Sequence, residues 1–191
     1  MRLFSADAWK GTEQYLDTQR KYEIARTVLY FVISAAVFLA GFLTTKTKMN
    51  LLTIVAVLGC LPACKSAVGM IMFLRYRSCS KEAACEIKKH IGDLNGLYDM
   101  VFTSYEKNFP IAHMVVKGNT ICGYTQRDDF DEQAFYKHLD GILKLDGYKE
   151  VSVKIFTELE KYTLRLEQLN QLEAGEKNTE GIVSTLKNVV L

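Results

Sequence analysis

The sequence contains few of the residue types from which enzymes build catalytic and metal sites. Its three histidines, His90, His113 and His138, are scattered, and none has a neighbouring ligand at the spacing of a metal site. The Gly-rich phosphate loops, the HExxH zinc motif and the GxSxG nucleophile turn are all missing. We therefore expect no enzyme activity, no bound metal and no cofactor, and we assign no catalytic residue.

Paired cysteines are also lacking. The chain has five cysteines, an odd number, and no two of them form a C-x-x-C pair. Two of the five, Cys60 and Cys64, lie inside a long apolar run. This usage is typical of a reducing, cytoplasmic setting rather than of a disulfide scaffold.

A strong excess of basic charge is absent from the polar part of the chain. Residues 75–191 hold sixteen basic and eighteen acidic side chains, and residues 1–26 hold five basic and four acidic ones. Affinity for nucleic acid comes largely from neutralising phosphates with Lys and Arg. We therefore expect no nucleic-acid partner.

Two long apolar runs, 27–44 and 51–74, dominate what is present, and neither contains Asp or Glu. As helices they would rise about 27 Å and about 36 Å, against a hydrocarbon core of about 30 Å. The link at 45–50 leaves room only for a tight turn, so the sequence predicts an antiparallel transmembrane hairpin. The first run follows a long polar stretch and lacks a small-residue cleavage site, so we interpret it as a true span rather than a signal peptide.

Basic residues are more numerous on the two outer flanks of the hairpin than in its turn. The turn carries Lys46 and Lys48, and the flanks carry Arg2, Lys10, Arg20, Lys21, Arg26, Arg75, Arg77 and Lys81. By the positive-inside rule, an integral membrane protein with both termini in the cytoplasm is expected.

The patterning predicts three parts. Residues 1–26 form a cytoplasmic juxtamembrane amphipathic helix, with helix expected over 5–24 and Ser5 as its cap. Residues 27–74 form the two-helix transmembrane hairpin. Residues 75–191 form a cytoplasmic α+β domain with the element order α-β-β-β-α-β-α-α.

Capping residues and alternation define the elements of that domain. Ser80 is predicted to cap a helix reaching about Asp93. Asp129 with Glu132, and Thr157 with Glu160, form capping boxes that begin two further helices. Strands are expected at 98–106, 110–117, 120–125 and 150–156, and a last helix carries Ile182, Leu186 and Val189.

Two features of this domain could suggest chemistry. The acidic cluster Asp128, Asp129, Asp131 and Glu132 is interpreted as a helix N-terminus, where carboxylates complement the helix dipole, rather than as a metal or catalytic site. His113 lies inside a predicted strand with no nucleophile paired to it, so we interpret it as a packed histidine.

The order helix, three strands, helix, strand resembles the core order of the PD-(D/E)XK nuclease-like fold, over about 75 residues. That resemblance implies an acidic-x-Lys motif on a strand. Val115 precedes Lys117 by two places and Ser152 precedes Lys154 by two places, so the motif is missing. A domain of this fold would be inactive as a nuclease.

Lys65 is the candidate residue for a ligand or ion pathway, because it lies near the middle of the second apolar run. A charge at the centre of a bilayer costs roughly 2.5–3.5 kcal/mol on insertion scales. The interpretations are a lysine snorkelling to the cytoplasmic surface, a lysine lining the lumen of an oligomer, and a lysine contacting a lipid head group or a partner's carboxylate.

Small residues near Lys65 predict where the two spans pack. Gly59, Ala63 and Ala67 are spaced four apart and form a smooth stripe that lets helix backbones approach closely. Pro62 removes one backbone hydrogen bond and is expected to bend the helix.

Three functions remain open. The first is a homo-oligomeric membrane protein whose cytoplasmic domain senses a ligand or a protein partner and acts through the hairpin, as a pore or another membrane effector. The second is a passive membrane-anchored interaction module. The third, with least support, is a membrane-bound enzyme of nuclease-like fold. Membrane lipid is an expected partner in each case.

Overall fold

The computed structural model describes residues 9–47, 51–172 and 178–191. Two units are distinguished: Leu16–Arg77 makes up a helical hairpin, and residues 9–15 belong with Ser78–Leu191 in an α+β unit.

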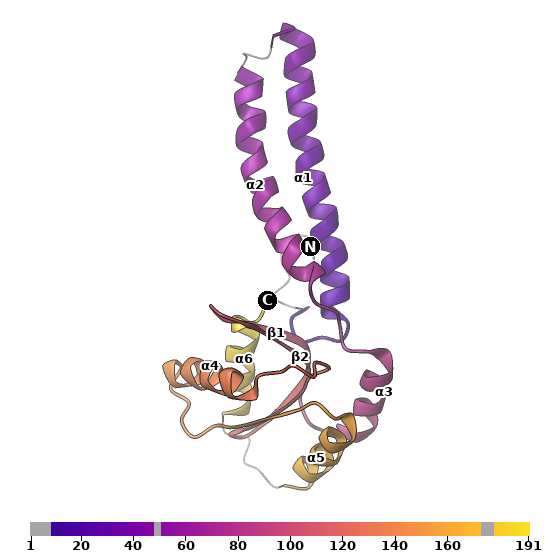
Figure 1. The fold of residues 1–191 in the computed structure, drawn as a ribbon, viewed down its shortest axis with the longest axis vertical. Helices are drawn as coiled ribbons and strands as arrows, with labels where there is room; N and C mark the ends of the chain where they lie inside the picture. Colours follow the sequence, from indigo (N-terminus) through magenta and orange to yellow (C-terminus); the bar gives the residue numbers. More distant parts are fainter. Residues whose placement is uncertain (1–8, 48–50, 173–177) are drawn as a thin grey trace. The chain divides into compact units, whose positions relative to one another are not determined.

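The hairpin unit consists of α1 (Tyr15–Thr45) and α2 (Leu51–Leu74) (Figure 1). Both helices are long and apolar enough to cross a membrane, and only 17% of each apolar window is buried. The predicted pair of long apolar helices is therefore confirmed. The first helix differs at its start: it begins at Tyr15, and residues 9–14 are not α-helical.

The helix expected over 5–24 is thus wrong for residues 9–14, and residues 5–8, including the proposed Ser5 cap, lie outside the described residues. Gly11 and Gln14 have φ angles of +82° and +56°, which do not fit a right-handed helix. The Gly11 carbonyl instead accepts a hydrogen bond from the Tyr98 amide at 2.9 Å. A tertiary contact thus replaces the predicted helical turns.

The α+β unit runs α3 (Lys81–His90), β1 (Gly96–Thr103), β2 (Asn108–Lys117), β3 (Thr120–Tyr124), α4 (Glu132–Leu145), β4 (Ser152–Phe156), α5 (Leu159–Gln171) and α6 (Thr179–Val189). Its four strands form one mixed sheet in the order β1-β2-β3-β4. The first three strands are antiparallel, and β4 pairs parallel to β3.

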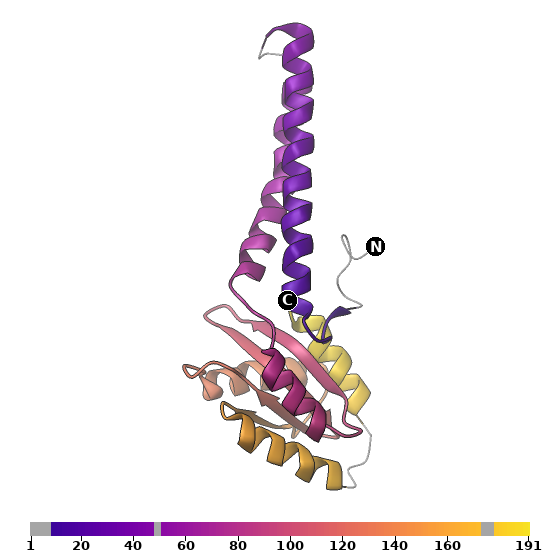
Figure 2. The same ribbon diagram turned by 90° about the vertical axis from the view of Figure 1, so that its right-hand side faces the viewer.

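Helices cover both faces of the sheet, α4 and α6 on one and α3 and α5 on the other (Figures 1 and 2). Because side chains alternate along a strand, neighbouring residues enter different cores. In β2, for example, Val116 packs with α4 and α6, whereas its neighbour Val115 packs with α3 and α5. The predicted small α+β domain is confirmed in this form.

Helix starts were predicted with mixed success. Ser80 caps α3 and accepts a hydrogen bond from the Ala83 amide at 3.3 Å. The cap of α4 is Asp131, not Asp129, and it accepts from the Ala134 amide at 3.0 Å. The cap of α5 is Glu158, whose side chain makes no capping bond, so the Thr157–Glu160 box is also wrong. In both errors the helix begins later than the box pattern indicates.

Candidate functional site

The seam between α1 and α2 contains small and polar side chains. Thr27, Ser34, Ala56, Ala63 and Ser66 are buried in it. Long apolar side chains point outward instead, among them Phe31, Val32, Leu39, Leu43, Leu58, Leu61 and Val68. A soluble hairpin would bury its apolar stripe, so this arrangement fits a helix pair packed in lipid.

Two contacts fix the register of the seam. The Thr27 and Ser66 hydroxyl oxygens lie 2.8 Å apart, and a Cβ built on Gly59 would lie 2.9 Å from the Ser34 hydroxyl oxygen. Gly59 lies at this close approach between the two helices. Of the other stripe members, Ala63 is fully buried and Ala67 is half-buried.

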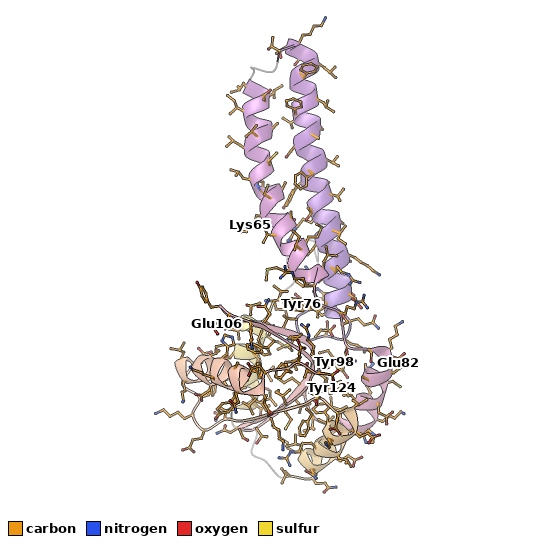
Figure 3. The ribbon with its side chains drawn as sticks, viewed as in Figure 1. Lys65, Tyr76, Glu82, Tyr98, Glu106 and Tyr124 are labelled. Carbon is orange, nitrogen blue, oxygen red and sulfur yellow. The ribbon has the colours of Figure 1, made fainter. Side chains whose placement is uncertain are left out.

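The same register fixes the level of Lys65 along the hairpin. The helices are antiparallel, so the Thr27–Ser66 contact places Lys65 level with Val28, just past the polar first turns of α1. Figure 3 shows Lys65 in the half of α2 that is farther from the turn. The rise from Leu51 to Lys65 is about 21 Å, so in a core of about 30 Å that begins at the turn, Lys65 lies about 9 Å from the opposite edge. The position near the middle of the apolar run is therefore not the middle of the core that the hairpin would span.

Lys65 is exposed, and no other described side chain pairs with it. Pro62 is exposed too and lies within α2. Lys65 follows Cys64 and precedes Ser66, and only Ser66 of these three faces α1. The structure therefore does not bring Lys65 together with the Gly59–Ala63 part of the seam.

A polar cluster lies one turn below this level and was missed by sequence reasoning. Glu23 is buried, pairs with Arg26, and accepts a hydrogen bond from Gln19 at 3.2 Å. Arg26 also lies 3.4 Å from the Ser66 hydroxyl. A Cβ on Gly69 would lie 3.4 Å from the Glu23 carboxylate. The lack of a side chain at Gly69 therefore leaves room for this carboxylate between the two helices. The spacing of Gln19 and Glu23, i to i+4, was the available signal.

In the α+β unit, His113 is fully buried, as expected of a packed histidine. Its Nδ1 lies 2.6 Å from the Tyr162 hydroxyl, and its ring packs on Tyr98 with 4.4 Å between centroids. Burial lowers the pKa of His113 to about 3 and raises the pKa of Tyr162 well above its usual value. The imidazole is therefore neutral and shielded from solvent, which is unsuited to a general base acting on a bound substrate.

The acidic cluster serves the start of α4. Asp131 caps the helix and pairs with Lys107 at 2.8 Å, a hydrogen bond that lowers the pKa of the Asp131 carboxyl. Asp129 pairs with Arg127 at 3.2 Å. Among the described residues, no group of three or more His, Cys, Asp or Glu could hold a metal ion.

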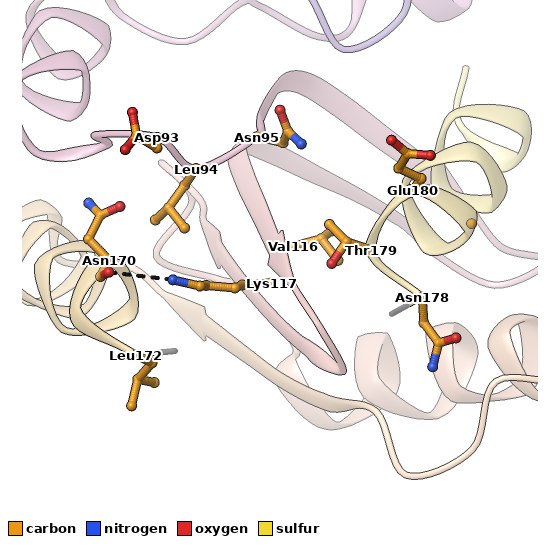
Figure 4. Close-up of a pocket in the computed structure, with 11 residues that line it drawn as sticks. Asp93, Leu94, Asn95, Val116, Lys117, Asn170, Leu172, Asn178, Thr179 and Glu180 are labelled. Carbon is orange, nitrogen blue, oxygen red and sulfur yellow. Dashed lines mark hydrogen bonds between the residues drawn. The ribbon is translucent and has the colours of Figure 1, made fainter. Parts of the chain in front are cut away.

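A pocket of about 650 Å³ lies between the end of β2 and the facing ends of α5 and α6 (Figure 4). Its polar groups are largely bonded within the fold. Lys117 donates to the Leu169 carbonyl at 2.7 Å, and Asn170 donates to the His90 and Ile91 carbonyls at 3.1 and 3.0 Å. Thr179 accepts from the Gly118 amide at 2.9 Å. The described lining contains no nucleophile beside a base.

Comparisons with protein-family models, with curated proteins and with solved structures give no match for this chain, so the arrangement of its own residues carries the functional argument.

Proposed function

We propose that this chain is a non-enzymatic, membrane-anchored interaction protein whose hairpin tethers the α+β unit to the cytoplasmic face of a membrane. One observation carries the proposal: the hairpin buries hydroxyl and small side chains and exposes its long apolar ones. Lipid accommodates that surface, and water does not. Both ends of the hairpin continue into the α+β unit, in keeping with two termini on one side.

The depth of Lys65 favours a tether over a pore. Lys65 is close to the polar edge of the hairpin, since the Thr27–Ser66 contact places it level with Val28, next to the charged first turns of α1. From there its ammonium group reaches the head groups by snorkelling. A snorkelling lysine requires no oligomer, so the homo-oligomer is not needed to explain this charge.

The pocket and the surface of the α+β unit supply the interaction part of the proposal. The described pocket lining offers hydrogen-bonding side chains without a catalytic pair. The missing acidic-x-Lys pattern at Lys117 and Lys154 argues in the same direction. A ligand or a protein partner would thus be bound without being converted.

Reconstitution into vesicles tests both the membrane anchor and the absence of a pore. Full-length protein inserted in vesicles should resist alkaline extraction, and protease should cleave both termini from one side only. Vesicles loaded with a fluorescent ion indicator should leak no faster than empty ones, with wild type and with Lys65→Leu alike. Native mass spectrometry in nanodiscs should give a monomer or dimer.

A closed assembly of four or more subunits with a leak that Lys65→Leu abolishes would instead establish the pore. To separate a tether from an effector, residues 27–66 are exchanged for an unrelated two-helix span. Residues 9–26 must be kept, because Gly11 and Glu13 contact the α+β unit. Partner binding should survive that exchange.

A further inference from the structure

The end of the hairpin where α1 begins and α2 ends carries more positive charge than the carboxylates of the hairpin neutralise. Between Leu16 and Arg77 the chain has only two acidic residues, and both are paired, Asp17 with Arg20 and Glu23 with Arg26. Besides Lys46 beside the turn, four exposed cations in this unit have no carboxylate partner among the described residues. They are Lys21, Lys65, Arg75 and Arg77, called the basal collar below.

The collar has two levels with apolar surface between them. Lys65 forms the upper level, and Arg75 and Arg77, which follow the end of α2, form the lower one. The levels are about 13–15 Å apart at helical rise. Val68, Ile71 and Leu74 lie between them and are 60%, 51% and 49% exposed. Cations above and below an apolar strip fit the boundary where acyl chains meet head groups.

Lys65 belongs to the outward side of α2. Residues three and four apart share a helix face, so Lys65 lies on the side of Leu61 and Val68, both exposed. The side toward α1 is occupied by Ala63 and Ser66, which are buried. The Lys65 ammonium group is therefore available to a molecule outside the helix pair.

We propose that the basal collar binds the phosphate groups of anionic phospholipids, in the leaflet at the end of the hairpin where Leu16 and Arg77 lie. The inference rests on the proposed membrane insertion and adds the class of lipid. Lys65 would reach down to the phosphate plane, while Lys21, Arg75 and Arg77 would reach it from the aqueous side. Each cation near an anionic surface should raise the association constant about fivefold.

The test uses full-length protein in phosphatidylcholine vesicles that contain a trace of spin-labelled phosphatidylglycerol or spin-labelled phosphatidylcholine. Electron paramagnetic resonance gives the fraction of each label immobilised by the protein, and hence a relative association constant. Wild type should prefer phosphatidylglycerol about fivefold or more, and added salt should weaken that preference.

Removing the collar should bring the preference close to one. The variant Lys21→Gln/Lys65→Gln/Arg75→Gln/Arg77→Gln removes all four charges, and Arg75→Gln/Arg77→Gln removes two and should give an intermediate value. The matched control is Lys137→Gln/Lys149→Gln, two exposed lysines of the α+β unit, and it should keep the wild-type preference. Flotation of each protein with the vesicles verifies insertion.

Two results would overturn the proposal in different ways. Wild type that floats with the vesicles but shows equal affinity for both labels would leave the anchor intact and remove the collar's lipid preference. Wild type that does not float would remove the membrane anchor and the collar's role together. An equal loss of preference in the Lys137/Lys149 control would assign the effect to net charge and also contradict the collar.

Discussion

Thr27 and Ser66 share a hydrogen bond of 2.8 Å between their hydroxyl oxygens across the seam of the hairpin. This contact pairs the first residue of one apolar run with a residue well inside the other. The second run therefore extends past the polar edge of the first, and its last turns lie level with charged residues of α1. Apolar length alone therefore overestimates the part of α2 that a membrane core would cover.

Gly59 should not accommodate a large side chain, because a Cβ there would already lie 2.9 Å from the Ser34 hydroxyl oxygen. Gly59→Ile is expected to destabilise the hairpin by about 1–3 kcal/mol, as overpacking usually does. Disulfide formation in a Thr27→Cys/Ser66→Cys background, with the five native cysteines replaced by serine, reports the seam. Val57→Ile, on the exposed side of α2, serves as control and should leave cross-linking unchanged.

Gly11 and Gly147 offer a matched pair, since their φ angles are +82° and +87°. A Cβ at Gly11 would lie 2.9 Å from Leu97, whereas a Cβ at Gly147 meets nothing within 4 Å. Gly147→Ala should therefore cost only the strain of positive φ, about 1–2 kcal/mol, and Gly11→Ala should cost more. Amide exchange at Tyr98, which donates to the Gly11 carbonyl, should speed up in Gly11→Ala alone. Equal exchange rates in the two variants would contradict the anchoring contact.

The histidines His113 and His90 should titrate in opposite directions from the ordinary value. Hydrogen bonds from His90 to Glu167 and Glu86 raise its pKa, whereas burial lowers the pKa of His113 to about 3. His113 binds a proton more readily in the unfolded chain than in the folded one. Its contribution to the free energy of unfolding is therefore complete above about pH 6.5 and is lost as the pH drops toward 3. The His90 contribution has the reverse sign and is lost as pH rises through its raised pKa.

NMR of the imidazole carbons separates the two histidines. The His113 resonance should stay constant from pH 8 to the start of acid unfolding, and the His90 resonance should shift with a midpoint above about 6.5. Tyr162→Phe removes the hydroxyl bonded to His113 and should cost about 1 kcal/mol of stability. A His113 midpoint near 6.5 in the folded protein would show that the ring is not buried as described.

The cysteines should differ sharply in reactivity. Burial raises the pKa of Cys79 to about 12, with Asp99 and Glu13 adding to the shift, and burial also raises the pKa of Cys122. Cys85 is exposed on α3. Because the thiolate is the reactive form, a membrane-impermeant maleimide should label Cys85 rapidly in inserted protein and spare Cys79 and Cys122.

Cys60 and Cys64 make the same experiment a test of insertion. They should remain unlabelled in vesicles and react after transfer to denaturant, and Cys85→Ser should abolish rapid labelling. Rapid reaction of Cys64 in intact vesicles would place that part of α2 in water and argue against the anchor.

Features that depend on residues close together in the sequence, such as a helix cap or a helix face, could be predicted. The stripe that includes Gly59 and Ala63 follows from helical spacing, and Ser80 was identifiable as a cap because a periodic apolar face follows it. The capping-box pattern points to Asp129, whereas the cap in the structure is Asp131, which also pairs with Lys107 from a distant turn. Residues 9–14 were assigned to a helix because their contact with Tyr98 is invisible in the sequence.

The level of Lys65 along the hairpin also depends on a tertiary contact, so the sequence could not predict it. Apolar content defines the two ends of each run, but the offset between two antiparallel helices depends on which side chains meet in the seam. Gly69 and Glu23 contribute to that offset through a close approach that only the paired helices display. The Glu23–Arg26 cluster was overlooked because Glu23 lies outside both apolar runs.

The hydrogen bond between the Gly11 carbonyl and the Tyr98 amide joins residues on either side of the whole hairpin. Because this contact joins segments that precede and follow the hairpin in the sequence, it constrains the order in which the α+β unit can fold. During synthesis the segment at Gly11 emerges first, yet its acceptor is satisfied only after both long helices and the start of β1 have been made. The α+β unit is therefore completed last, and a chain stalled or truncated within the hairpin would leave its N-terminal segment without its sheet.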